Sequence, residues 1–262
     1  MLKFLVVFTI SVLSFSGFSA ERIVILSPGA GDIVQKLGAE SKVVGVTKSL
    51  EGFDKAVRVG SHIKPNVEII RSLNPDLLIV SGGKYFTDEM KSAIDAKTIV
   101  YDPRSLDEVL EGLRTIGKEL SKVDIADSLE KSLRNEISGL KNPACSPKVF
   151  YEVSQIPLMA AGNDSIIGDS IKRAGGYLVP VSDKKLYKTN IETVLTSKPD
   201  IYIWQTGAMN RNPVPPKDRG EYQSLKAVYV HVNEYDFSRA NTQSFKNVIF
   251  LNRAFSDYCK SK

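Results

Sequence analysis

The sequence holds two histidines, and their surroundings differ. His62 lies in a predicted loop rich in Gly, Ser and Pro, whereas His231 lies inside the apolar run Val228–Val232 and is expected to be structural. A metal held by protein side chains alone needs three or four convergent ligands. One loop histidine cannot supply them, so we predict that no metal is bound by the protein directly. A metal would arrive inside its own chelator.

A glycine-containing turn, Ser27-Pro28-Gly29-Ala30-Gly31, follows the first predicted strand and opens a helix. Such a turn presents backbone N–H groups to a ligand. With Glu51 about twenty residues on, it also begins a dinucleotide-binding fingerprint, but Val34 replaces the third glycine. The sequence lacks the G-x-S-x-G and H-E-x-x-H motifs of hydrolases and zinc proteases. We therefore expect neither an enzyme nor a cofactor; a secreted α/β enzyme or an interaction module is the alternative.

Two glutamates occupy equivalent places in an internal repeat. The segment Asn66–Val80 aligns without a gap to Asn190–Trp204, and each copy runs from an Asn through a short helical pattern and a Pro-Asp turn into a strand. Glu68 and Glu192 both fall in the first helical turn, where a carboxylate stabilises the helix dipole by ~0.3–1 kcal/mol without any partner. The repeat indicates two lobes that share a substructure.

Short β-branched runs alternate with helical patterns in two groups, separated by a helical span. Continuous apolar runs of this kind are typical of strands buried in a parallel sheet. Ser105 and Glu108 form a capping box at the start of the helical span. We predict an α/β fold of two Rossmann-like lobes, over residues 21–121 and 143–262, joined by one long helix over 122–142, with the ligand cleft between them. The predicted strands are Ile23–Leu26, Val43–Thr47, Leu77–Val80, Thr98–Tyr101, Lys148–Val153, Ile201–Trp204 and Val228–Val232.

The N-terminus predicts export. Lys3 is followed by an uncharged stretch that is apolar at first and ends in small residues at Ala20. This order is typical of a cleavable signal peptide, predicted over residues 1–20. No Cys lies near the cleavage site, so we expect no lipid anchor and a monomer free in the periplasm.

Charge and cysteine content bound the partners further. The net charge of +5 falls to +4 once Lys3 is removed, and both signs are spread along the chain without a Lys/Arg run. We therefore expect no nucleic-acid partner. Cys145 and Cys259 are the only cysteines. In an oxidising compartment they either pair or stay free, and the sequence leaves both open.

Five segments in order resemble the periplasmic binding proteins for iron-siderophores, haem and vitamin B12, over nearly the whole mature chain. They are ILSPGAGDIVQKLG, NVEIIRSLNPDLLIVSGG, AAGNDSIIGDSIKRAGG, NIETVLTSKPDIYI and FSRANTQ. The resemblance implies capture of a metal chelate, an iron-siderophore or a corrinoid, in the cleft. It also implies delivery to the permease dimer of an ABC importer with a cytoplasmic ATPase, with Glu68 and Glu192 docking on permease arginines.

The resemblance and the strand ends together give the expected ligand contacts. His62 matches a position that faces the ligand, Arg239 matches an arginine that neutralises an anionic chelate, and Tyr187 lies in the loop that corresponds to that of His62. Haem is less expected, because Ser61 and His62 stand where haem binders of the family carry a tyrosine. The full expected set is Ser27, Pro28, Gly29, Ala30, Gly31, His62, Ser81, Gly82, Tyr187, Trp204 and Arg239.

Overall fold

The computed structural model describes residues 19–262 of the chain. The predicted signal peptide lies outside the described residues except for Ser19 and Ala20. Ala20 is buried, and its N–H donates to the carbonyl of Glu119 at 3.0 Å. Within the described part, no helix is both long and apolar enough to cross a membrane.

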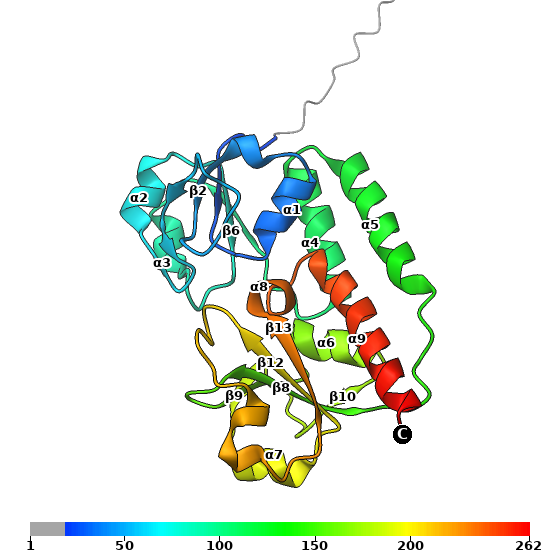
Figure 1. Ribbon diagram of the computed structural model, residues 1–262. Helices are drawn as coiled ribbons and strands as arrows, with labels where there is room; N and C mark the ends of the chain where they lie inside the picture. The colour runs from blue at the N-terminus through cyan, green and yellow to red at the C-terminus, as the bar shows by residue number, and fades with distance from the viewer. Residues whose placement is uncertain (1–18) are drawn as a thin grey trace, which may run out of the picture.

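The first lobe is a parallel five-stranded sheet in the order β3-β2-β1-β6-β7, with helices on both faces (Figure 1). Alternate residues of β1 and β6 point into two separate apolar clusters, which explains why these strands are continuous apolar runs. The elements are β1 (Ile23–Ile25), α1 (Ala30–Lys36), η1 (Glu40–Lys42), β2 (Val43–Val46), β3 (Val57–Arg58), the hairpin β4 (Gly60–Ser61) and β5 (Lys64–Pro65), α2 (Val67–Ser72), β6 (Leu77–Val80), α3 (Asp88–Ser92), β7 (Lys97–Val100) and α4 (Leu106–Glu119).

The second lobe is built on a mixed sheet. Strands β10, β8, β12 and β13 run parallel, whereas β9 and β11 pair antiparallel. The α/β class predicted from the sequence is confirmed, and the antiparallel strands are an addition to it. The elements are β8 (Lys148–Ser154), β9 (Met159–Ala161), α6 (Ile166–Arg173), β10 (Tyr177–Leu178), β11 (Leu186–Lys188), α7 (Ile191–Ser197), β12 (Ile201–Thr206), η2 (Pro216–Asp218), η3 (Gly220–Tyr222), β13 (Val228–Asn233), α8 (Glu234–Phe237) and α9 (Gln243–Lys260).

The repeat seen in the sequence is a repeat in the structure. Asn66 caps α2 and Asn190 caps α7, each side chain accepting the N–H three residues on. The Asp of each Pro-Asp turn accepts the N–H at the start of the neighbouring strand, Asp76 from Arg22 and Asp200 from Lys148. The same short sequence therefore builds equivalent corners of the two lobes.

The connection between the lobes is helical only in its first part. Helix α5 (Val123–Ser138) packs against α4, and the following residues 139–147 are extended. A helix was expected through residue 142; Gly139 and then Pro143 oppose its continuation. The extended part follows α9, where Asn252 donates to the carbonyl of Lys141 and Cys145 is joined to Cys259 by a disulfide.

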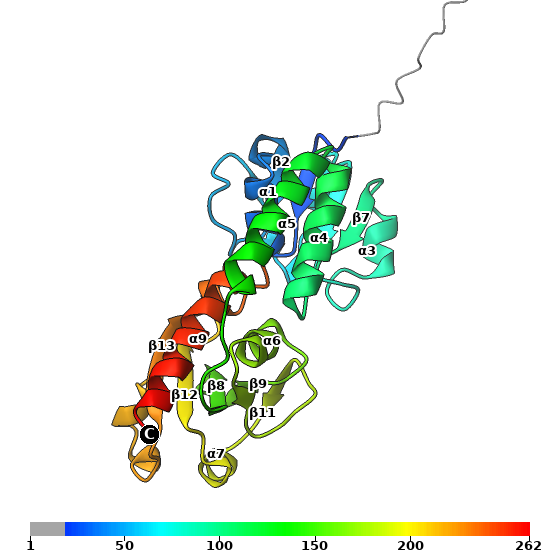
Figure 2. The ribbon, with the colours of Figure 1, turned by 90° about the vertical axis from the view of Figure 1, so that its right-hand side faces the viewer.

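Helices α5 and α9 run side by side along one edge of the molecule, α5 on the first lobe and α9 on the second (Figures 1 and 2). The start of α9 also binds the first lobe, because the backbone N–H and the hydroxyl of Thr242 donate to one Asp32 carboxylate oxygen at 3.0 and 2.7 Å. The last helix of the chain therefore spans the seam between the lobes.

Candidate functional site

The carboxyl ends of the parallel strands of both lobes face one seam. In open α/β sheets these ends are where ligands bind. Contacts between residues far apart in sequence define the seam: the Tyr101 hydroxyl donates to the Ala240 carbonyl at 3.0 Å, and Arg239 donates to the Ser49 carbonyl at 2.9 Å. The expected ligand contacts can therefore be judged by whether they lie at this seam.

Arg239 lies at the seam as a half-buried cation. Its guanidinium stacks on the Tyr235 ring at 4.0 Å, and burial lowers its pKa. Among the described residues, no carboxylate lies within ion-pair distance of it, unlike the paired Arg104 and Arg173. A partly desolvated arginine without a counter-ion favours the binding of an anion.

His62 approaches the same place from the first lobe. Burial lowers its pKa, and the charges of Arg239 and Lys185 lower it further, so the ring is neutral at pH 7. Its ring meets that of Tyr85 edge-on, with centroids 5.9 Å apart. The structure therefore brings His62 and Arg239 into one electrostatic environment.

The loop after β6 lies next to His62 and is open. A Cβ on Gly82 or Gly83 would meet no atom within 4 Å, and Gly82 has a φ of 113°, which favours glycine. Ser81 is half-buried. Tyr85, on the same loop, was missed by the sequence analysis, although its place just after a strand end was an available signal.

The Ser27–Gly31 turn is covered. Ser27 Oγ donates to the Tyr101 carbonyl at 2.7 Å, and a Cβ on Gly29 would lie 2.4 Å from the Ala240 carbonyl oxygen. We expected the N–H groups of this turn to face an open cleft; in this structure the second lobe packs over them instead. Ser27, Gly29, Ala30 and Gly31 are buried and Pro28 is half-buried, and their contact with a ligand stays a prediction.

Tyr187 and Trp204 are not gathered with Arg239. The Tyr187 hydroxyl donates to the Pro180 carbonyl at 3.1 Å, and burial raises its pKa to about 12. Trp204 does not end its strand as expected, because β12 continues to Thr206. Its ring stacks on that of His231 at 4.2 Å, in a cluster on the sheet face opposite Gln205. Their roles as ligand contacts remain predictions.

Glu68 and Glu192 are exposed on the first turns of α2 and α7. Glu68 pairs with Arg71 on the same helix at 2.5 Å, an exposed pair that contributes little to stability. Both carboxylates are therefore accessible to a partner, as docking requires.

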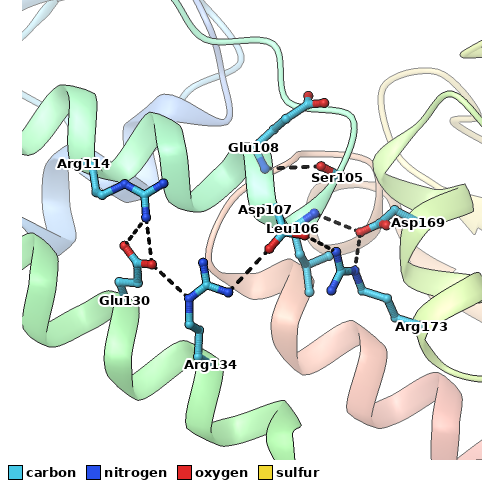
Figure 3. Close-up of polar contacts among 9 residues, drawn as sticks. All are labelled: Ser105, Leu106, Asp107, Glu108, Arg114, Glu130, Arg134, Asp169 and Arg173. Carbon is cyan, nitrogen blue, oxygen red and sulfur yellow. Dashed lines mark hydrogen bonds and ion pairs between the residues drawn. The ribbon is translucent and has the colours of Figure 1, made fainter.

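Charged side chains also bridge the seam beside α5 (Figure 3). The Asp169 carboxylate of α6 accepts the N–H of Leu106 at 2.9 Å and so caps α4 from the other lobe. Arg173 binds both Asp169 and Asp107, at 2.8 and 2.6 Å. We call Asp107, Asp169, Arg173 and the Leu106 N–H the interlobe latch. Its chain of contacts continues through Arg134 and Glu130 to Arg114.

A second set of ion pairs crosses the seam nearer to the site. Lys185 binds Asp102 at 2.7 Å, and Arg104 binds both Asp102 and Asp164. A cavity of about 330 Å³ lies beside β7 and α4, lined by Asp102, Glu108 and Glu111 among others, but neither His62 nor Arg239 lines it. We place the candidate site at His62 and Arg239, because their charge and burial indicate an anionic ligand, whereas that cavity is rimmed by carboxylates.

No three His, Cys, Asp or Glu side chains within residues 19–262 are grouped as a metal ion would require. The arrangement at the seam, one free cation, one neutral imidazole and nearby aromatic rings, suits binding of an organic anion or chelate.

Comparison with known proteins gives consistent results. The family model described as periplasmic binding protein matches residues 23–230. A vitamin B12-binding protein of Vibrio cholerae is 24% identical over 193 residues, 70% of each chain. An uncharacterized ABC transporter substrate-binding lipoprotein of Bacillus subtilis is 29% identical over 201 residues, 68% of this chain and 63% of the relative. The solved structure of a periplasmic haem-binding protein with two haems superimposes with a TM-score of 0.78 at 15% identity, covering 92% of this chain and 99% of that one, and supports the fold.

Proposed function

The chain belongs to the periplasmic binding protein family, and we propose that it captures a metal chelate between its two lobes and delivers it to an ABC importer. The observation that carries the ligand part of this proposal is Arg239, a half-buried arginine at the seam with no carboxylate partner. A chelate with an anionic group would supply the missing counter-charge.

The relatives suggest the ligand classes to be compared. The Vibrio cholerae protein is named for vitamin B12 and the structural neighbour for haem. A ferric siderophore is the third class, expected from the resemblance of the sequence. We propose that this chain binds one member of this group, in a cleft that opens at the seam beside His62 and Arg239.

We propose a permease dimer with its ATPase as the membrane partner, and Glu68 and Glu192 as the docking residues. The Bacillus subtilis relative is an ABC transporter protein, which supports the partner. That relative is also a lipoprotein, so the expected absence of a lipid anchor from this chain stays a prediction. The family is one of binding proteins, which favours transport over the enzymatic alternative.

Isothermal titration of the mature protein with cyanocobalamin, haemin and a ferric hydroxamate tests the proposal. We expect one of the three to saturate at one molecule per chain, without turnover. Absence of binding by all three would remove the chelate proposal. Chemical conversion of the ligand would favour the enzyme.

Arg239→Ala should weaken binding of the anionic chelate by about 1.5–3 kcal/mol, the range for hydrogen bonds to charged groups. Arg253 on α9 is exposed and provides the matched control, because Arg253→Ala removes the same charge away from the seam. Equal affinities for wild type and Arg239→Ala would remove Arg239 from the site.

A further inference from the structure

A fully buried ion pair lies in the second lobe. Glu152 of β8 has no exposed surface, and its carboxylate accepts Nη1 and Nη2 of Arg219 at 2.6 and 2.8 Å. The Tyr202 hydroxyl donates to the same carboxylate at 2.5 Å. Burying two charges costs several kcal/mol for each ion, so the net stability gained from such a pair is small. Its effect on the geometry of the surrounding chain is the better explanation for its presence.

The pair anchors the rim loop, residues 207–220, which follows β12. Arg219 uses its third donor, Nε, to bind the Val214 carbonyl at 2.7 Å. Asn210 donates to the Gln205 carbonyl and accepts the N–H of Gln155, at 2.8 and 3.0 Å. The Gln155 side chain in turn accepts the N–H of Val214 at 2.9 Å. The loop is thus held in one shape by the protein itself, and it needs no ligand to order it.

The anchored loop exposes aliphatic side chains. Met209 and Val214 are 46% and 48% exposed, and Ile156, in the adjoining turn after β8, is 86% exposed. We call these three residues the apolar rim. They follow the carboxyl ends of β8 and β12, and in Figure 1 the segment after β12 rises toward the first lobe on the side away from α5 and α9. Exposed apolar side chains gathered at such a place mark a binding surface.

The apolar rim adjoins Arg239. The N–H of Met209 donates to Glu234 Oε2 at 2.6 Å, and Glu234 begins α8, the short helix that leads to Arg239. Ser238, the residue before Arg239, donates to Gln205 at the end of β12. The rim and the unpaired guanidinium are therefore held together by the same few hydrogen bonds.

We propose that the apolar rim binds the apolar body of an amphiphilic anionic ligand whose charged group pairs with Arg239, and that Arg219 is a positioning residue for the rim. This rests on the proposed function and narrows its substrate class to chelates with a large hydrocarbon or aromatic surface. A compact, uniformly polar chelate such as ferric citrate would leave the rim in water and bind weakly.

The probe for the rim is 1-anilinonaphthalene-8-sulfonate, an aromatic anion whose fluorescence rises in apolar surroundings. Methyl-labelled methionine reports its position, with Met209 assigned by Met209→Leu. We expect the dye to shift the Met209 methyl signal and to leave that of Met90, on α3, in place. No binding to the wild type, or binding that leaves Met209 unmoved, overturns the proposal.

Serine substitutions give the energetic test. Ile156→Ser/Met209→Ser/Val214→Ser should weaken dye binding by about tenfold or more, as expected from removing several buried CH₂ groups. The matched control, Val57→Ser/Val100→Ser/Val228→Ser, alters side chains of comparable exposure elsewhere and should not change affinity. Equal affinities for the rim variant and the control overturn the proposal.

Arg219→Lys tests the positioning role. Lysine keeps the buried charge but cannot bind both Glu152 oxygens and Val214 together. We expect weaker dye binding and an altered Met209 signal in the folded variant. A lower Tm with unchanged dye affinity and an unchanged Met209 signal would show a purely structural role and overturn this part.

The two proposals fail separately. If the titrated chelates do not bind but the dye still requires the rim and Arg239, the chelate function fails and the rim stands. If a chelate binds and the rim variant binds it equally well, the rim fails and the function stands. If the rim variant loses only docking to the importer in vesicles, the rim is a protein-docking surface, and the ligand proposal is overturned.

Discussion

Arg239 and His62 belong to different lobes, and each alone has an ordinary explanation as a surface residue. Their meaning comes from the seam, where Arg239 is half-buried without a counter-ion and His62 feels its charge. Tyr101 and Lys185 lie at the same seam and tie the lobes together there. At the scale of the residue, the site is a positively charged place closed by neutral aromatic and imidazole rings.

The lowered pKa of His62 predicts a pH dependence of stability. The unfolded chain binds a proton at His62 more readily than the folded chain does, so the contribution of His62 is fully present above the ordinary histidine pKa of ~6.5 and is lost as the pH falls below it. Urea unfolding from about pH 8 to about pH 5 should show this loss, and His62→Asn should reduce it. His231→Asn, at the exposed second histidine, should retain it. An equal pH dependence in both variants would contradict this role of His62.

At the scale of the element, the short helices α2 and α7 are copies of one motif, each capped by an Asn and each with a Glu on its first turn. A helix cap and a dipole explain the local sequence. They do not require the same arrangement on both lobes. A dimeric permease presents two equivalent surfaces, which supports a docking role for the pair.

The double variant Glu68→Lys/Glu192→Lys should keep its ligand affinity and lose docking to the importer in reconstituted vesicles. Complementary charges at an interface rim mainly set orientation and association rate. Glu111→Lys/Glu136→Lys, on the exposed faces of α4 and α5, is the control for total charge. Normal uptake by the first variant would leave the two glutamates with a role in the helix dipole only.

At the scale of the whole molecule, the lobes are held by the interlobe latch, by α9 and by the disulfide. The latch joins α4 to α6, and α9 reaches from the second lobe to Asp32 of the first. These contacts lie along one edge of the molecule (Figure 2). They oppose rotation of one lobe against the other more than a single flexible linker would.

Small-angle scattering should therefore give nearly the same radius of gyration for the free and the chelate-loaded protein. Asp169→Asn/Arg173→Gln removes the charged contacts of the latch and should increase the difference between the two states. Marked compaction of the wild type on loading would show that the latch and α9 do not hold the lobes.

Removing the disulfide should destabilise the chain. Cys145 and Cys259 are 114 residues apart, and a cross-link closing so long a loop is worth ~4–5 kcal/mol in the loop-entropy model. Cys145→Ser/Cys259→Ser and the reduced wild type should both unfold at lower urea. An unchanged midpoint would show that the cross-link adds nothing to the packing of α9.

The local sequence determined the elements whose pattern is strong. The apolar runs of β1, β2 and β6 lie within about a residue of their predicted bounds, because strands buried on both faces have no polar positions to blur the signal. Ser105 accepts the N–H of Glu108 as the capping box predicts, although the Glu108 carboxylate binds the N–H of Arg104 rather than that of Ser105. The repeat also followed from sequence alone, since identical caps and turns need only neighbouring residues.

Tertiary structure alone decided the composition of the seam. β9 and β11 are three residues each and form by pairing in the sheet, so no periodic pattern announces them. The turn at Gly29 is covered because Ala240 reaches it from the far end of the chain. Whether Arg239 is paired or free, and whether Tyr85 meets His62, depends on how the two lobes pack. Such contacts join residues distant in sequence, and only the packed chain brings them within reach of one another.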